Sequence, residues 1–259
     1  MPGPTILGVS LKMYLTHRDT VRWSQQVASV ANSHPAAQDG SAELFVLPSF
    51  PAIPACLETF AGTPVRVGAQ DIATDDAGAF TGEVSGRMLA ELGCTLAEVG
   101  HAERRRIFGE TDDVVAAKAV AALRNGLTPV MCVGEPDRTT PEQAAAACIR
   151  ELSVVVDAAR SKGHPAQLIV AYEPQWAIGA SEPASAEHTG GVCRRIREWL
   201  AARPATAGSR VIYGGSAGPG LLTRLGDSVD GLFLGRFAHD PNAVKIILDE
   251  VPITAGARA

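Results

Sequence analysis

Charged and polar side chains follow short apolar runs at several places along this 259-residue sequence. The clearest example is LIVAYEPQWAIGA, Leu168–Ala180, in which an apolar run ends in Glu173 and continues at once through a proline. Lys12 and His101 also stand just after apolar runs. A carboxylate, an imidazole and an ammonium group are side chains that acid–base catalysis uses, although any one of them alone is more often structural. If the fold brings them together, they predict proton-transfer chemistry at one site.

Two glycine-containing turns close later apolar runs and indicate a site for an anion. They are YGGS, Tyr213–Ser216, and LFLGR, Leu232–Arg236. Glycines allow backbone N–H groups to converge on a phosphate, and the loops after the last two strands of a (β/α)8 barrel commonly bind one. Gly-Gly-Ser alone would indicate only a turn. The interpretation therefore depends on where these turns fall in the fold.

The elements that must position these residues alternate between short β-type runs and longer helical patterns. Segments such as DVVAAKAVAALRNG repeat apolar residues every three or four positions and close on glycine or proline. This alternation predicts right-handed βαβ units and a parallel sheet. Eight such units in about 250 residues match a single (β/α)8 barrel spanning residues 1–259. The expected strands are Thr5–Val9, Glu43–Leu47, Val65–Ala69, Leu96–Gly100, Pro129–Val133, Leu168–Tyr172, Arg210–Tyr213 and Gly231–Leu234.

The competing architecture is an open, doubly wound sheet. That fold commonly shows G-x-G-x-x-G after its first strand, whereas SLKMYL follows Val9 here. We find no linker that would divide the chain, and we expect the tail TAGARA, Thr254–Ala259, to be frayed. In a barrel, the polar residues at the strand ends would share one rim. They are Lys12, Gln70, His101, Glu135, Glu173, Ser216 and Arg236.

Composition and charge argue against several other classes of protein. The net charge is −5 and no run of five like charges occurs, so we expect no nucleic-acid partner. No stretch of 18 apolar residues occurs, so we expect no membrane span, and MPGPTILGVS lacks the features of an export signal. The five cysteines show neither C-x-x-C nor zinc spacing. We therefore predict no metal site and a reducing, cytoplasmic location.

Seven ordered motifs resemble the triosephosphate isomerase family over nearly the whole chain. They are LKM, GAFTGEVS, VGHAERR, FGE, CVGE, AYEPQWAIG and YGGS. The resemblance implies a (β/α)8 TIM barrel and an aldose–ketose isomerase that needs no cofactor and acts on a small sugar phosphate through an enediolate. It also implies a homodimer built through Gly78–Ser85, in which Thr81 reaches the neighbouring subunit's site near Lys12. An apolar Phe80 in that stretch suits a subunit contact.

The resemblance also assigns catalytic roles to four side chains. Glu173 would be the base that moves a proton between two carbons, and loss of solvent under a closing loop would raise its basicity. His101 would polarise the substrate carbonyl as a neutral ring. This family is itself the reference case for that pairing, so the resemblance supplies the assignment. Lys12 would neutralise the phosphate and the enediolate. Glu103 would be tied to Lys12 or to the proton relay, with a purely structural ion pair as the alternative.

A lid and a phosphate site are implied in the same way. PQWAIGASEPA, Pro174–Ala184, would close over the site and exclude water, so that the enediolate is protonated before it loses phosphate. Trp176 gives this lid apolar surface, and Tyr213 is the expected latch of its closed form. Backbone amides would supply most of the contacts to phosphate. The phosphate-gripping positions are Gly179, Ser216, Gly235 and Arg236.

Three departures from the family pattern lie within the site. They are Ser10-Leu11 for the usual Asn-Trp, Glu182-Pro183 for Lys-Thr on the lid, and Arg236 for the second glycine of the last loop. The short side chain of Ser10 opens space beside the substrate oxygens, and Arg236 brings a fork of donors to the anion site. These features resemble a branch of the family that acts on four-carbon ketose phosphates. We therefore expect L-erythrulose 1-phosphate as the substrate.

Other functions remain as alternatives. Ordinary drift at these positions would leave a triosephosphate isomerase that interconverts dihydroxyacetone phosphate and glyceraldehyde 3-phosphate. A sugar-phosphate lyase or aldolase would need a Schiff-base lysine on an inner strand or a metal cluster, and neither is visible in the sequence. A non-catalytic phosphate-binding barrel is disfavoured because Lys12, His101 and Glu173 are all present.

Overall fold

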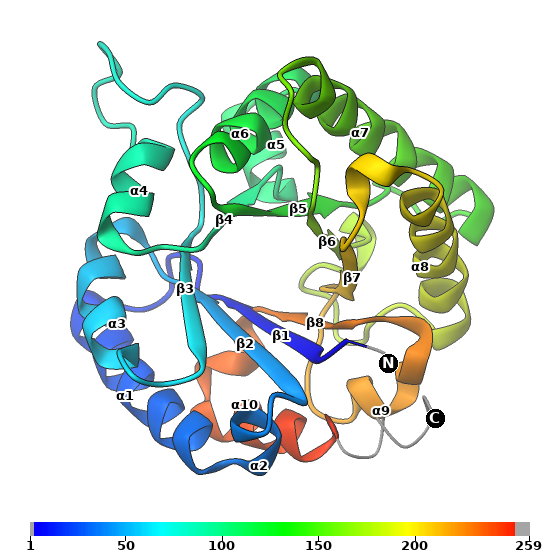
Figure 1. The fold of residues 1–259 in the computed structure, drawn as a ribbon. Helices are drawn as coiled ribbons and strands as arrows, with labels where there is room; N and C mark the ends of the chain where they lie inside the picture. The colour runs from blue at the N-terminus through cyan, green and yellow to red at the C-terminus, as the bar shows by residue number, and fades with distance from the viewer. Residues whose placement is uncertain (1–2, 252–259) are drawn as a thin grey trace.

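Eight parallel strands form a closed barrel in chain order, in which each strand is hydrogen-bonded to the next and β8 returns to β1. The structure is a computed structural model that describes residues 3–251. Figure 1 looks into the barrel, with helices arranged around it. The predicted (β/α)8 barrel is confirmed, and the open sheet is excluded. The strands are β1 Thr5–Ser10, β2 Ala42–Leu47, β3 Val65–Ala69, β4 Leu96–Val99, β5 Thr128–Val133, β6 Ile169–Tyr172, β7 Arg210–Tyr213 and β8 Gly231–Leu234.

Every observed strand overlaps the strand expected from the sequence, with boundaries that differ by a residue at some ends. The barrel closes where Ile6 of β1 lies opposite Gly231 of β8, while Thr5 lies opposite Ala42 of β2. The tail Thr254–Ala259, expected to be frayed, lies outside the described residues.

Side chains alternate between two apolar layers along each strand. On β2, Leu44 and Val46 belong to a large cluster that also contains helix residues, whereas Phe45 and Leu47 belong to a smaller cluster of strand residues only. Successive side chains of a strand point to opposite faces, so the smaller cluster fills the barrel and the larger one lies beneath the helices. Burial on both faces explains why the strands are almost continuously apolar.

Helices cover the outside of the barrel, and hydrogen-bonded caps fix the residues at which the rim loops end. Thr16, Thr111, Thr140 and Ser185 each accept a hydrogen bond from the backbone N–H three residues later. Each such cap stabilises its helix by about 1 kcal/mol. The α-helices are α1 His17–Ser33, α2 Pro35–Gln38, α3 Ile53–Phe60, α4 Gly86–Leu92, α5 Ala102–Phe108, α6 Asp112–Arg124, α7 Pro141–Ser161, α8 Ala186–Ala201, α9 Leu221–Leu225 and α10 Pro241–Asp249. The 3-10 segments are η1 Phe50–Ala52, η2 Gln175–Ala177, η3 Pro204–Thr206, η4 Gly226–Ser228 and η5 Arg236–His239.

The loop between β3 and α4 stands away from the barrel (Figure 1). Residues 77–83 of this loop, including Phe80 and Thr81, are exposed. Its base is held by Arg124 of α6, whose guanidinium donates to the carboxylate of Asp76 at 2.8 and 3.0 Å. The extended tip is therefore anchored at its base while its apolar side chain faces solvent.

Candidate active site

A cavity of about 330 Å³ opens at the carboxyl ends of the strands. The residues predicted for catalysis and substrate binding come from the ends of five different strands, β1, β4, β6, β7 and β8, and the barrel brings all of them to this cavity. Thr81, predicted as a subunit contact, is not among the lining residues and lies on the projecting loop. The predicted residues that line the cavity are Ser10, Lys12, His101, Glu103, Glu173, Gly179, Ser216, Gly235 and Arg236.

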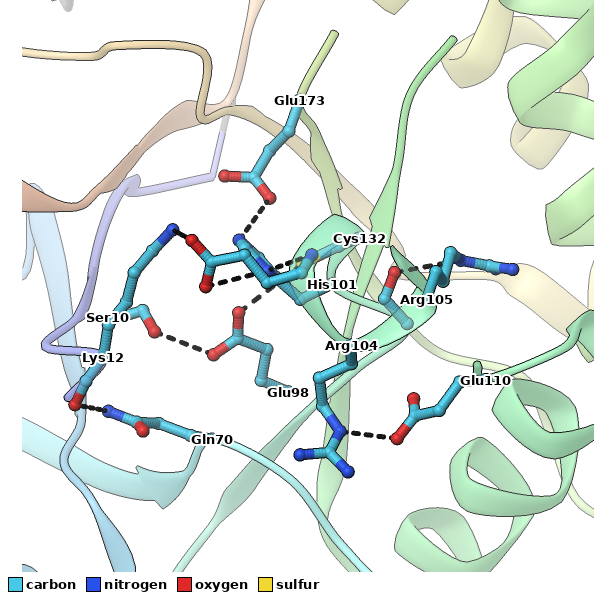
Figure 2. A network of polar contacts seen from close by, with 12 residues as sticks. Ser10, Lys12, Gln70, Glu98, His101, Arg104, Arg105, Glu110, Cys132 and Glu173 are labelled. Carbon is cyan, nitrogen blue, oxygen red and sulfur yellow. Dashed lines mark hydrogen bonds and ion pairs between the residues drawn. The ribbon is translucent and has the colours of Figure 1, made fainter. Parts of the chain in front are cut away.

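Glu173 and His101 face each other at the cavity. Glu173 follows β6 and His101 follows β4, and Glu173 Oε2 lies 3.4 Å from His101 Nε2 (Figure 2). Both residues are buried, and neither of these two atoms has a hydrogen-bond partner in the structure. Gly214 makes this approach feasible, since a Cβ there would lie 2.5 Å from Glu173 Oε1. Buried polar atoms are rarely left unpaired, so these two atoms are suited to meet a bound molecule.

The hydrogen bonds of His101 determine which ring nitrogen carries its proton. His101 caps α5, and its Nδ1 accepts the backbone N–H of Glu103 at 3.1 Å. A nitrogen that accepts from an amide cannot carry a proton itself, so the neutral ring holds its proton on Nε2. That N–H is directed toward Glu173 and the cavity. The geometry therefore presents a hydrogen-bond donor to a substrate oxygen.

Lys12 is held in place by contacts to its backbone and its side chain. Its Nζ lies 2.8 Å from Glu103 Oε1, and Gln70 Nε2 donates to its carbonyl at 3.0 Å. Burial opposes the charge on Lys12, but the hydrogen bond to Glu103 and the negative charges of Glu173, Glu103 and Glu98 raise its pKa overall. Burial alone would raise the pKa of Glu103. The contact with Lys12 outweighs this effect, so the pKa of Glu103 is lowered overall. Both members of the pair are therefore charged at neutral pH.

Two residues at the cavity have strained backbones. Within residues 3–251, Lys12 and Ser216 are the non-glycine residues with positive φ, at 51° and 52°. Such conformations cost on the order of 1–3 kcal/mol and persist where surrounding contacts enforce them. For Ser216, those contacts are hydrogen bonds from its Oγ to the carbonyls of Ala177 at 2.8 Å and Ala180 at 3.0 Å.

The predicted lid, Pro174–Ala184, is held at both ends. Near its start, Trp176 Nε1 donates to Glu135 Oε1 at 2.8 Å. At its end, the backbone N–H of Ala184 donates to the hydroxyl of Tyr213 at 2.9 Å. Between these points, Arg236 Nη2 lies 3.5 Å from the carbonyl of Gly179. The lid thus contacts the loops after β5, β7 and β8, and its residues Ile178 and Gly179 line the cavity.

Two charged residues at the cavity were not predicted from the sequence: Arg106, which lines it, and Glu98, which lies behind Ser10. Glu98 lies on β4, is 3% exposed, and accepts a hydrogen bond from Ser10 Oγ at 2.8 Å. Burial raises its pKa to about 7. The sequence carried a signal, because Glu98 is an acid inside the expected apolar strand Leu96–Gly100. Its partner could not be read from the sequence, because Ser10 reaches it only across the closed barrel.

The described residues offer neither a cluster of metal ligands nor a membrane-spanning helix. Across residues 3–251 there is no group of three or more histidine, cysteine or acidic side chains arranged to hold a metal ion. None of the helices in that part of the chain is both long and apolar enough to span a bilayer.

Comparison with known proteins agrees with this geometry. A family model described as triosephosphate isomerase matches residues 5–251. An L-erythrulose-1-phosphate isomerase of Pectobacterium atrosepticum is 53% identical over 244 residues, which cover 94% of each chain. A protein of the same name from Rhizobium etli is 37% identical over 95% of this chain and 91% of its own. A triosephosphate isomerase of Thermus thermophilus is 44% identical over 68% of this chain and 72% of its own. The chain therefore belongs to the triosephosphate isomerase family.

Proposed function

We propose that this protein is an isomerase of a small sugar phosphate, with L-erythrulose 1-phosphate as its preferred substrate. The observation that carries the reaction type is the pair of buried, unpartnered atoms, Glu173 Oε2 and His101 Nε2, which face each other 3.4 Å apart at the cavity. A base and a hydrogen-bond donor in this arrangement suit removal of a proton from a carbon next to a carbonyl group.

In the proposed reaction, Glu173 removes the proton from the hydroxyl-bearing carbon beside the carbonyl. The electrons of that C–H bond form a carbon–carbon double bond, and the carbonyl oxygen gains the negative charge of an enediolate. His101 donates from Nε2 to this oxygen, and Lys12 stabilises the charge. Glu173 then returns the proton to the neighbouring carbon while a hydroxyl proton passes between the two oxygens. Atoms and electrons balance without an oxidant or reductant.

Phosphate binding is proposed for the part of the cavity that the loops after β6, β7 and β8 line. Gly179, Ser216 and Gly235 line the cavity on three loops, and backbone N–H groups in such turns bind anions. The exposed guanidinium of Arg236 lies beside Gly179 and adds charge to this part of the cavity. The lid carries Gly179, so phosphate binding and lid closure would be coupled.

The same chemistry can act on a three-carbon or a four-carbon substrate, so the choice between them rests on the space beside Ser10 and on the relatives. Dihydroxyacetone phosphate and L-erythrulose 1-phosphate both carry a carbonyl next to the phosphate-bearing carbon. The same proton shift interconverts a ketose with an aldose in the triose, and a ketose with a second ketose in the tetrulose. The additional CH2OH group of the tetrulose extends beyond the reacting carbon, away from the phosphate. The small side chain of Ser10 provides space there, and two relatives carry the matching name.

The test is a substrate panel with kcat/KM measured for both compounds. We expect L-erythrulose 1-phosphate to exceed dihydroxyacetone phosphate by about tenfold or more, which is about 1.4 kcal/mol of transition-state preference. The double variant Ser10→Asn with Arg236→Gly, which restores the family residues, should narrow or reverse this ratio. Efficient triose turnover without tetrulose activity would make the protein a triosephosphate isomerase in the glycolytic sense.

We also propose that the protein works as a homodimer. Met13, next to Lys12, is 93% exposed, and Phe80 at the tip of the projecting loop is exposed as well. Ile107 and Phe108, at the end of α5, are exposed apolar residues too. Exposed apolar side chains on the segments that follow β1, β3 and β4 favour burial against a second copy. The five free, buried cysteines support a reducing, cytoplasmic location.

A further inference from the structure

Glu98 is a carboxylate inside the barrel, directly beneath the cavity. Along β4, Ala97 and Val99 pack in the outer apolar layer, whereas Leu96 packs in the inner one. The alternation of side chains therefore turns Glu98 inward. On its own layer it lies among apolar side chains such as Val130 of β5, which is opposite it in the strand register. An apolar side chain would satisfy packing at this position without the cost of burying an acid.

Burial of the carboxylate is only partly compensated by its contacts. Ser10 Oγ lies 2.8 Å from Glu98 Oε2, and Cys132 Sγ lies 3.8 Å from Glu98 Oε1. A thiol is a weak donor, so Ser10 supplies the main hydrogen bond. Removing a carboxylate from water costs several kcal/mol, which two such partners do not recover. A buried acid with so few partners is therefore better explained by function than by stability.

The contact with Ser10 sets which way the serine hydroxyl points. Ser10 lines the cavity, but Glu98 does not, so Glu98 can act on a bound molecule through Ser10. A serine hydroxyl has one proton and two lone pairs. When that proton is donated to Glu98, only the lone pairs remain for the cavity. Figure 2 shows this pair below His101, with Glu173 on the other side of the ring.

We propose that Glu98 is a positioning residue for substrate selection: it takes the proton of Ser10, so that Ser10 presents an acceptor to the terminal hydroxyl of the four-carbon substrate. The inference rests on the proposed function, because only the tetrulose has a hydroxyl beyond the reacting carbons at that place. A triose lacks this additional CH2OH group beyond the reacting carbon and gains nothing from the oriented serine. Glu98 and Ser10 together therefore raise the ratio of tetrulose to triose turnover.

The test compares the kcat/KM ratio of L-erythrulose 1-phosphate to dihydroxyacetone phosphate among variants. Glu98→Leu removes the acceptor that orients Ser10, and Ser10→Ala removes the hydroxyl. Each should lower the ratio by about fivefold to tenfold, the usual effect of one neutral hydrogen bond. The double variant should lower it no further, because both substitutions break the same chain of contacts. Glu98→Gln keeps a carbonyl oxygen that can accept from Ser10, so it should restore most of the ratio.

A control variant tests whether the Ser10 contact is responsible for the change in ratio, and the substrate preference of the wild type separates this inference from the proposed function. Val130→Ala removes interior volume beside Glu98 without touching the Ser10 contact, and it should leave the ratio unchanged even if stability falls. A wild-type enzyme that prefers the triose would overturn both proposals. A wild-type enzyme that prefers the tetrulose, with the ratio unchanged in Ser10→Ala, would overturn this inference alone. If Glu98→Leu does not fold, Glu98→Met keeps the length of the side chain while removing the acceptor, and an unchanged ratio in that variant would overturn the role of Glu98.

Discussion

At the scale of single residues, the arrangement of Glu173 makes a sharp prediction about catalysis. Glu173→Gln keeps the size of the side chain but removes the proton acceptor. Because no other carboxylate faces His101 Nε2 among the described residues, kcat should fall by at least about a thousandfold. Binding of phosphoglycolate, measured by calorimetry, should change far less. A Gln variant that retained about a tenth of wild-type activity would contradict the assignment of Glu173 as the base.

The raised pKa of Glu98 predicts how the stability of the protein depends on pH. Burial raises this pKa to about 7, and the charges of His101, Glu173 and Lys12 modify it. Below about pH 4.5 the acid is protonated in both the folded and the unfolded state, so stability is lost as pH rises from about 4.5 through about 7, and the loss levels off above that pH. Wild type should lose about 2–3 kcal/mol more unfolding free energy between pH 5 and pH 8 than Glu98→Gln does.

Urea unfolding of both proteins at pH 5 and pH 8, at one protein concentration, measures this difference. Glu151, whose pKa burial also raises to about 7, is unchanged in the variant, so its contribution cancels in the comparison. Equal pH dependence in wild type and Glu98→Gln would show that Glu98 does not titrate in this range.

At the scale of elements, the sequence predicted the strands well because their periodicity is local. Each apolar run ended at a polar residue, and parallel strands carry their ends to one rim, so the strand boundaries alone placed Lys12, His101 and Glu173 together. Ser10, Glu103, Gly179 and Gly235 were predicted from the family resemblance. The link between Ser10 and Glu98 could not be predicted in this way. It joins β1 to β4, which are not neighbours in the barrel, and depends on closure of the sheet. The hydrogen bond between Trp176 of the lid and Glu135 also joins residues far apart in the sequence, so it could not be predicted from the strand ends either.

The lid makes a prediction of its own at this scale. Tyr213→Phe removes the hydroxyl that accepts the N–H of Ala184, so the closed lid loses the contact at its end. Water should then reach the enediolate, and kcat/KM should fall by about tenfold or more. The amount of inorganic phosphate released per turnover should rise, since an exposed enediolate loses its phosphate. If phosphate release stays at the wild-type level, the hydroxyl of Tyr213 does not control lid closure.

At the scale of the whole molecule, the proposed dimer connects the projecting loop to the strained Lys12. The left-handed backbone of Lys12 needs surrounding contacts to hold it, and within one chain Gln70 supplies a hydrogen bond to its carbonyl. Met13, the next residue, is almost fully exposed in the single chain. A second subunit that covered Met13 would restrict this loop further and hold Lys12 in the cavity. Dimerisation should therefore support activity as well as stability.

Phe80→Asp places a charge at the exposed tip of the projecting loop and should prevent the contact. Light scattering should give twice the 27.0 kDa of one chain for wild type and a single-chain mass for the variant. Activity of the variant should fall by about tenfold or more, because a mobile Lys12 no longer stabilises the enediolate. Ile246→Asp on α10, on the far side of the barrel from this loop, adds the same charge at another exposed apolar residue and should leave both the mass and the activity unchanged. If wild type or Phe80→Asp is fully active as a monomer, activity does not depend on dimerisation, and the proposed link between the dimer and Lys12 is wrong.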